Sequence, residues 1–192
     1  MTAASRWQPD AATLAAGARI RVPYHGGPPA DEGTEQRPID PRVLAIRDAV
    51  QARFPQVVTT YTYGRDYAGT EFVDIHRDGR AVDLMAPDYA TGTAVASWLI
   101  QQAAADPVAF PVQYLIWWGT QWGTVAGDST QTARTFKDYN GASNHHDHVH
   151  VEVARADSPL VVLSGGWTLP GVLAGLGLVG ATWWFLTRKR TR

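Results

Sequence analysis

The segment that decides the fold reads Asp147-His148-Val149-His150-Val151-Glu152-Val153. Because successive side chains of a β-strand point to opposite faces, the valines share one face and His148, His150 and Glu152 share the other. The valine face suits a hydrophobic core, whereas three titratable groups side by side are costly unless they share a task. The segment therefore predicts a strand that places a polar site on one face of a sheet.

A second group of titratable residues lies upstream, around a turn signal. Asp78-Gly79 is a strong indicator of a two-residue turn, and it predicts a β-hairpin over residues 72–85. In that hairpin Asp74 would lie directly opposite Asp83. His76 and Asp83 would be diagonal neighbours about 7 Å apart, a separation from which both side chains reach one ion.

These two segments together predict a metal site. His76, Asp83 and His150 would supply three ligands and leave a fourth position for water, which is the composition of a catalytic zinc site. His148 shares a face with His150, so it would lie near that water or the developing oxyanion, either as a base or as a stabilising group. The remaining carboxylates expected around the ligands are Asp147, Asp74 and Glu152.

A family resemblance rests on two motifs, His76-x-x-Gly79-x-Ala81-x-Asp83 and His148-x-His150. They resemble the signature of the LAS group of bacterial zinc peptidases. That group includes D-Ala-D-Ala carboxypeptidases and murein endopeptidases, and it shares its metal scaffold with the hedgehog signalling domain. The resemblance covers about 41–153 and is strongest to an actinobacterial cell-wall branch. It implies that the two motif histidines His76 and His150 bind Zn²⁺ with Asp83, and that His148 acts in catalysis.

Some residues depart from the family pattern. Relatives place an arginine before the first motif to bind a substrate carboxylate or the oxyanion, and Arg65 is the candidate here, with a solvated loop charge as the alternative. Asp74 stands where many relatives have serine. The Glu-x-x-His arrangement of the carboxypeptidase members is absent, which leaves the general base open and favours the endopeptidase-like members.

The resemblance implies a function, and alternative functions are also considered. We expect zinc-dependent hydrolysis of amide bonds in peptidoglycan peptides, of endopeptidase or D,D-/L,D-carboxypeptidase type. The alternative is a non-catalytic, zinc-containing module that binds peptidoglycan or a partner. A histidine-rich metal nuclease is disfavoured, because all 18 acidic residues precede the basic C-terminal end and leave an acidic body. We therefore expect no nucleic-acid partner.

The fold class follows from the remaining periodicity. Asp40-Pro41 supplies a helix N-cap and a first-turn proline, and apolar residues follow at helical spacing up to Pro55. Further predicted elements are a strand at 57–63, a helix at 93–105, a buried strand at 112–117 and a long polar loop at 119–143. The prediction is an α+β domain with a small, mainly antiparallel sheet and flanking helices, of the LAS/hedgehog type.

The C-terminal segment is different in kind. No charged residue occurs over 158–187, and the apolar run is long enough to span a bilayer as one helix. Arg188-Lys189-Arg190 follows and places the tail in the cytoplasm by the positive-inside rule, so the catalytic domain would lie outside, although no signal peptide is evident. The predicted order is a loosely ordered arm at 1–40, a catalytic domain at 41–156, a linker at 157–166, a transmembrane helix at 167–187 and a basic tail at 188–192.

Overall fold

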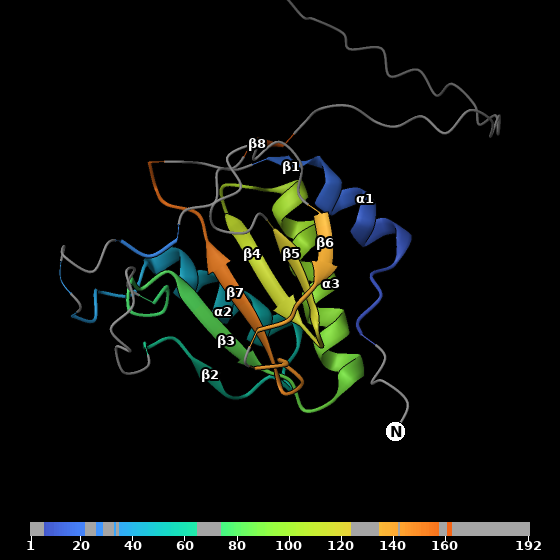
Figure 1. Cartoon of the computed structure of the whole chain (residues 1–192), viewed down its shortest axis with the longest axis horizontal. Helices are drawn as coiled ribbons and strands as arrows, with labels where there is room; N and C mark the ends of the chain where they lie inside the picture. Colours follow the sequence, from blue (N-terminus) through green and yellow to red (C-terminus); the bar gives the residue numbers. More distant parts are fainter. Residues whose placement is uncertain are drawn as a thin grey trace, which may run out of the picture.

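The computed structural model describes residues 6–21, 26–28, 33, 35–64, 74–123, 135–141, 143–157 and 161–162. Within them the chain is α+β, as predicted, with three helices and a six-stranded antiparallel sheet (Figure 1). The helices are α1 (Ala11–Arg19), α2 (Pro41–Arg53) and α3 (Tyr89–Ala105). The strands are β1 (Ile20–Arg21), β2 (Thr60–Tyr61), β3 (Ala81–Met85), β4 (Val112–Trp117), β5 (Thr120–Gly123), β6 (Thr135–Asp138), β7 (His148–Val153) and β8 (Val161–Val162).

The main sheet has the strand order β2-β3-β7-β4-β5-β6, and each neighbouring pair is antiparallel. The strand that decides the fold, β7, therefore lies inside the sheet between β3 and β4. Its valines are fully buried on one face, where α2 and α3 pack (Figure 1). This apolar layer forms the core, and it leaves the opposite face of β7 for the titratable side chains, as the alternation predicted.

Capping hydrogen bonds set the residues at which two of the helices begin. Asp40 caps α2 by accepting a hydrogen bond from the Arg42 backbone N–H, and Pro41 occupies the first turn. Asp88 caps α3 in the same way through the Thr91 backbone N–H. The predicted helix at 93–105 therefore starts four residues earlier, because this cap adds a first turn.

The N-terminal region differs from the prediction. Residues 6–21 are an ordered part of the core rather than a loose arm: Asp10 caps α1, and Trp7 and Ile20 are buried. The helix α1 packs on α3, and β1 pairs with β8 from the predicted linker. The frequent proline and glycine residues further along the 1–40 stretch dominate its composition and obscure the signal of this short element.

Two other predictions about local structure are wrong. The predicted hairpin is not formed: its second strand is present as β3, but residues 74–80 form a tight turn in which Asp78 N–H bonds to the Asp74 carbonyl and Arg80 N–H to the Ile75 carbonyl. Asp74 consequently does not face Asp83. The predicted loop at 119–143 contains strands β5 and β6.

The predicted transmembrane helix at 167–187 lies outside the described residues. Among the residues that are described, no helix is both long enough and apolar enough to cross a membrane.

Candidate metal centre

The centre is built on two neighbouring strands inside the sheet, β3 and β7. The register of β3 and β7 places Asp83 directly opposite His150 and Ala81 opposite Glu152. Since directly opposed residues of an antiparallel pair point to the same face, Asp83, His150 and Glu152 share one face, with His148 two residues away. We call this the metal face.

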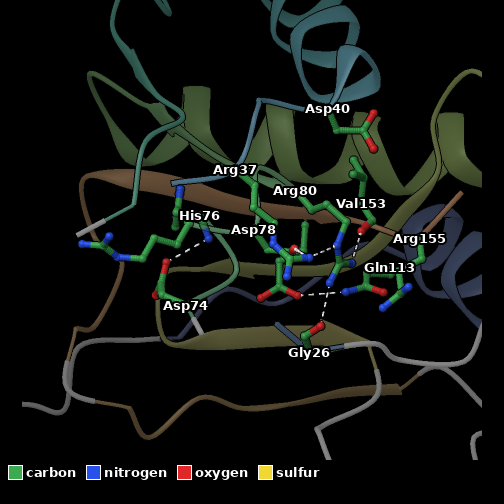
Figure 2. A network of polar contacts seen from close by, with 12 residues as sticks. Gly26, Arg37, Asp40, Asp74, His76, Asp78, Arg80, Gln113, Val153 and Arg155 are labelled. Atoms are coloured by element: carbon green, nitrogen blue, oxygen red, sulfur yellow. Dashed lines mark hydrogen bonds and ion pairs between the residues drawn. The ribbon is translucent and has the colours of Figure 1, made fainter. Parts of the chain in front are cut away.

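The third predicted ligand comes from outside the sheet. His76 lies in the turn formed by residues 74–80, which we call the ligand turn, and Asp74 stabilises its start by accepting a hydrogen bond of 2.8 Å from the His76 backbone N–H (Figure 2). The turn carries the imidazole to the metal face, where His76 Nε2 lies 3.3 Å from Asp83 Oδ1. The predicted proximity of His76 and Asp83 is confirmed, although the predicted hairpin is not its cause.

His76, Asp83 and His150 each direct one potential ligand atom toward the same point. His150 Nδ1 lies 2.9 Å from Asp83 Oδ1 and 3.3 Å from His76 Nε2. All three residues are buried, and their ligand atoms lie within 4.8 Å of one another, so the cluster can hold a metal ion. Two imidazoles and one carboxylate suit a borderline divalent cation.

A third imidazole, that of His148, faces the same cluster. His148 Nε2 lies 3.7 Å from Asp83 Oδ1, and within the described part of the chain this buried nitrogen has no hydrogen-bond partner. Its Nδ1 lies 2.7 Å from an oxygen of the exposed Asp147. That hydrogen bond lowers the pKa of Asp147 and fixes the imidazole with Nε2 toward the ligands. The unpartnered nitrogen is an acceptor or donor available to a bound group.

Glu152 and Gln113 form a buried chain of hydrogen bonds behind His150, which we call the relay. Glu152 Oε1 is 3.1 Å from His150 Nε2, and Glu152 Oε2 accepts a hydrogen bond of 3.1 Å from Gln113 Nε2. A β-bulge between Val112 and Tyr114 occurs where β4 carries Gln113. The relay fixes the imidazole so that Nδ1, not Nε2, is its ligand atom. Glu152 is thus a partner of a ligand, as predicted, and Gln113 is a member that sequence reasoning missed.

The two buried charges near the ligand atoms stabilise each other. Burial alone would raise the pKa of Asp83, but hydrogen bonds and charge from His150 and His76 outweigh it and hold that pKa well below its usual range. Burial lowers the pKa of His150, yet the carboxylates of Asp83 and Glu152 outweigh burial and raise it to about 9. A proton and a cation therefore compete for the same ligand nitrogen, and cation binding releases the proton.

His145 is a further imidazole beside the ligand cluster, and it lies next to His148. It is buried, its ring centroid lies 4.7 Å from that of His148, and its Nδ1–H donates to the Ser143 carbonyl at 2.9 Å. Burial first, and then the charges of His150 and His148, lower the pKa of His145 to about 4. A neutral imidazole with its lone pair on Nε2 consequently lies beside the predicted catalytic histidine.

Aromatic side chains of the β4–β5 region divide between core and metal face. Trp117 and Trp122 are fully buried in the core. Tyr114 lies on the metal face, with its ring centroid 6.4 Å from that of His150 and its hydroxyl donating to Gln121 Oε1. Burial, with the charge of Glu152, raises the pKa of Tyr114, so its phenol stays protonated. Arg65, the predicted oxyanion or carboxylate ligand, lies outside the described residues.

Comparison with known proteins gives a family but no individual relative. No curated protein and no solved structure matches the chain. A family model described as VldE, C-terminal domain, matches residues 35–150, a range that contains every residue of the ligand cluster. Because this match extends over more than half of the chain, the protein belongs to the VldE C-terminal domain family.

Proposed function

We propose that this protein is a zinc-dependent peptidase that hydrolyses amide bonds in peptidoglycan peptides. One observation carries the proposal: three buried side chains converge as ligands, and two further imidazoles, His148 and His145, lie beside them. A structural zinc site is normally closed by four protein ligands, whereas a catalytic site keeps one position open. The described cluster has three protein ligands, so its composition supports a catalytic rather than a structural role for the metal.

The donor set fits zinc among the divalent cations. Imidazole and carboxylate ligands in a three-residue set are typical of hydrolytic zinc sites, and the Glu152 carboxylate on His150 matches the usual carboxylate–histidine–zinc arrangement. When bound, zinc supplies Lewis acidity, which polarises a carbonyl group and makes water more acidic. His76, Asp83 and His150 would hold it.

The other residues of the centre have separate tasks in this proposal. His145 is neutral near pH 7 and accepts a proton from the attacking water. His148 donates a hydrogen bond from Nε2 to the developing oxyanion, and the Asp147 carboxylate on Nδ1 holds this imidazole in the required orientation. Arg65 remains the candidate for a second contact to the oxyanion or to a substrate carboxylate. The substrate class rests on the resemblance of the two motifs to LAS peptidases.

The membrane anchor also remains a proposal. A helix at 167–187, with the basic residues of 188–192 in the cytoplasm, would hold the catalytic domain on the outer side, where peptidoglycan lies. Protease added to intact protoplasts should then digest the domain and spare an epitope placed after Arg192. Digestion of the epitope with protection of the domain would contradict this orientation.

The activity is tested by digesting purified peptidoglycan with the full chain, purified in detergent and loaded with zinc, and by identifying released peptides by mass spectrometry. His76→Ala and His148→Ala are the matched controls, because the first should lose metal and the second should keep it. New amine and carboxyl termini that appear only with the unaltered protein would support the proposal. Peptidoglycan left intact by a folded, zinc-loaded protein would contradict it and favour a binding module.

A further inference from the structure

One amide side chain joins the ligand turn to two other parts of the chain. Gln36 Nε2 lies within hydrogen-bond distance of the carbonyl oxygens of His76 at 3.1 Å, Arg77 at 3.3 Å and Arg37 at 2.9 Å. On its other side, Gln36 Oε1 accepts a hydrogen bond of 2.7 Å from the backbone N–H of Gly64. A single partly buried side chain therefore satisfies backbone groups of three segments that are distant in sequence.

The backbone that follows Gln36 continues along the same turn. The Arg37 N–H donates to the Arg77 carbonyl at 2.8 Å, and the Asp40 N–H donates to the Gly79 carbonyl at 2.9 Å. The Arg37 guanidinium also pairs with the Asp78 carboxylate at 3.1 Å (Figure 2). Residues 36–40 thus lie against the ligand turn over its whole second half.

The ligand turn and its neighbours approach each other closely. Gly79 has φ +74°, in the left-handed region that favours glycine, and a Cβ added there would overlap the carbonyl oxygen of Pro38. Gly64 is similarly packed, since a Cβ there would overlap the Arg77 side chain. The turn is therefore packed against segment 36–40, which contains Gln36, and against Gly64, whose N–H donates to Gln36.

The ligand turn matters because it carries the only one of the three clustered ligands that does not lie on a strand. Asp83 and His150 are held in register by the β3–β7 ladder. His76 has no such support, and its Nε2 must meet Asp83 Oδ1 and His150 Nδ1 within 3.3 Å. A small displacement of the turn would move this nitrogen away from the common point, whereas it would leave the other two ligands in place.

We infer that Gln36 is a positioning residue of the metal centre, which sets the place of His76 by holding the backbone of the ligand turn. The inference rests on the proposed metal site and adds to it a residue 40 positions from the ligand it serves. The match to the family model begins at residue 35, so it includes Gln36 and the segment that follows.

The test compares zinc affinities of full-length variants by competition with a chromophoric chelator. Gln36→Met keeps the length and volume of the side chain but removes all four hydrogen bonds, and it should weaken zinc binding about tenfold, the lower range for loss of a partner behind a ligand. Gln101→Met is the matched control, because among the described residues the Gln101 amide bonds to the Thr13 hydroxyl, between α3 and α1 and away from the ligand turn. It should leave zinc affinity unchanged.

A mutant cycle with His76→Ala separates positioning from general damage to the fold. Without the imidazole, the place of the turn no longer matters, so Gln36→Met should cause no further loss in the His76→Ala background. The Co²⁺ absorption spectrum should change in Gln36→Met but not in Gln101→Met, because only the former moves a ligand.

The outcomes distinguish this inference from the proposed metal site. If the unaltered chain binds zinc, His76→Ala weakens binding and Gln36→Met does not, the metal site stands and the role of Gln36 is wrong. If Gln36→Met lowers zinc affinity equally in the unaltered chain and in the His76→Ala variant, the role of Gln36 is also wrong, because the effect then does not depend on His76. If the unaltered chain binds no zinc, the proposed metal site and the role of Gln36 are both wrong.

Discussion

The relay behind His150 allows a quantitative prediction about the charge on Glu152. Glu152→Gln changes one oxygen to an amide nitrogen and keeps the shape of a side chain that is only 4% exposed. The remaining amide oxygen can still accept a hydrogen bond from His150 Nε2, but the full negative charge 3.1 Å from that nitrogen is lost. The amide nitrogen would also face the donor nitrogen of Gln113. The variant therefore tests charge more than packing.

The expected loss is about tenfold in zinc affinity near pH 7, or about 1.4 kcal/mol. It falls at the low end of the usual range for such partners because Glu152 stabilises the competing proton as well as the cation. That carboxylate helps to raise the pKa of His150 to about 9. Removing it therefore weakens the binding of the proton as well as the binding of the cation. As pH rises through 9, the proton leaves the unaltered protein and its affinity increases. The variant has less to gain, and the ratio of the two affinities should grow with pH.

Chelator competition or calorimetry at pH 7 and at pH 9.5 measures both effects. Asp147→Asn is the matched control, since it is the same carboxylate-to-amide change beside a different imidazole, that of His148. It should leave zinc affinity within about a factor of two, a change of about 0.4 kcal/mol. Equal losses in both variants, or a Glu152→Gln loss that shrinks at high pH, would refute the reasoning.

Three further predictions address catalysis, pH and packing. His148→Ala should retain zinc but lose about 10²–10³ in turnover, and loss of zinc measured by atomic absorption would place it among the ligands instead. Asp40→Ala should cost about 1 kcal/mol of unfolding free energy near neutral pH. Burial opposes ionisation there, but hydrogen bonds from Arg42 lower the pKa of Asp40. The stabilisation is therefore present above the ordinary carboxyl pKa and lost as pH falls below about 4, where urea titrations of the two proteins should converge. Gly92→Ala would put a Cβ into the Trp117 ring and should destabilise the fold by about 1–3 kcal/mol, despite the helix preference of alanine, so a raised urea midpoint would contradict it.

The central strands were predictable because their signal is local and repeats. The alternation over 148–153 needs no knowledge of the neighbours to place valines on one face and titratable groups on the other. The register that sets Asp83 opposite His150 was not predictable, since it depends on the pairing of β3 with β7 across 67 residues. The ligand set could nevertheless be chosen, because two motifs of known chemistry limited the candidates.

The prediction of a two-residue hairpin turn at Asp78-Gly79 failed for a physical reason. Asp78-Gly79 ends a helical turn, while the two-residue turn between β4 and β5 is formed by Trp118-Gly119, with both residues at positive φ. A bulky residue in the first position is unusual, and here Trp118 packs against the rings of His146 and Tyr89. Tertiary packing thus outweighs a local preference, and no pattern in a single sequence shows which will prevail.

Other parts of the centre carried a weak signal in the sequence or none. Gln36 stands in a polar stretch like any other, and its amide is informative only once the ligand turn lies beside it. Gln113 was a weak signal, a polar residue inside an apolar strand. His145 could have been suspected from four histidines within six residues, but its anchoring to the Ser143 carbonyl depends on a positive φ of 52°.

The buried N-terminal segment has a consequence for where this protein may be cut. Trp7 and Ile20 are at most 1% exposed, and β1 forms a ladder with β8, which lies beyond residue 150. A fragment trimmed to 35–150 would lose both side chains, the ladder and the end of β7. Removal of one buried tryptophan side chain alone costs about 3–5 kcal/mol, against a total stability of about 5–15 kcal/mol. We therefore expect the stretch that the family model matches, 35–150, to be too short to fold by itself, and residues 6–21 to belong to the smallest stable unit.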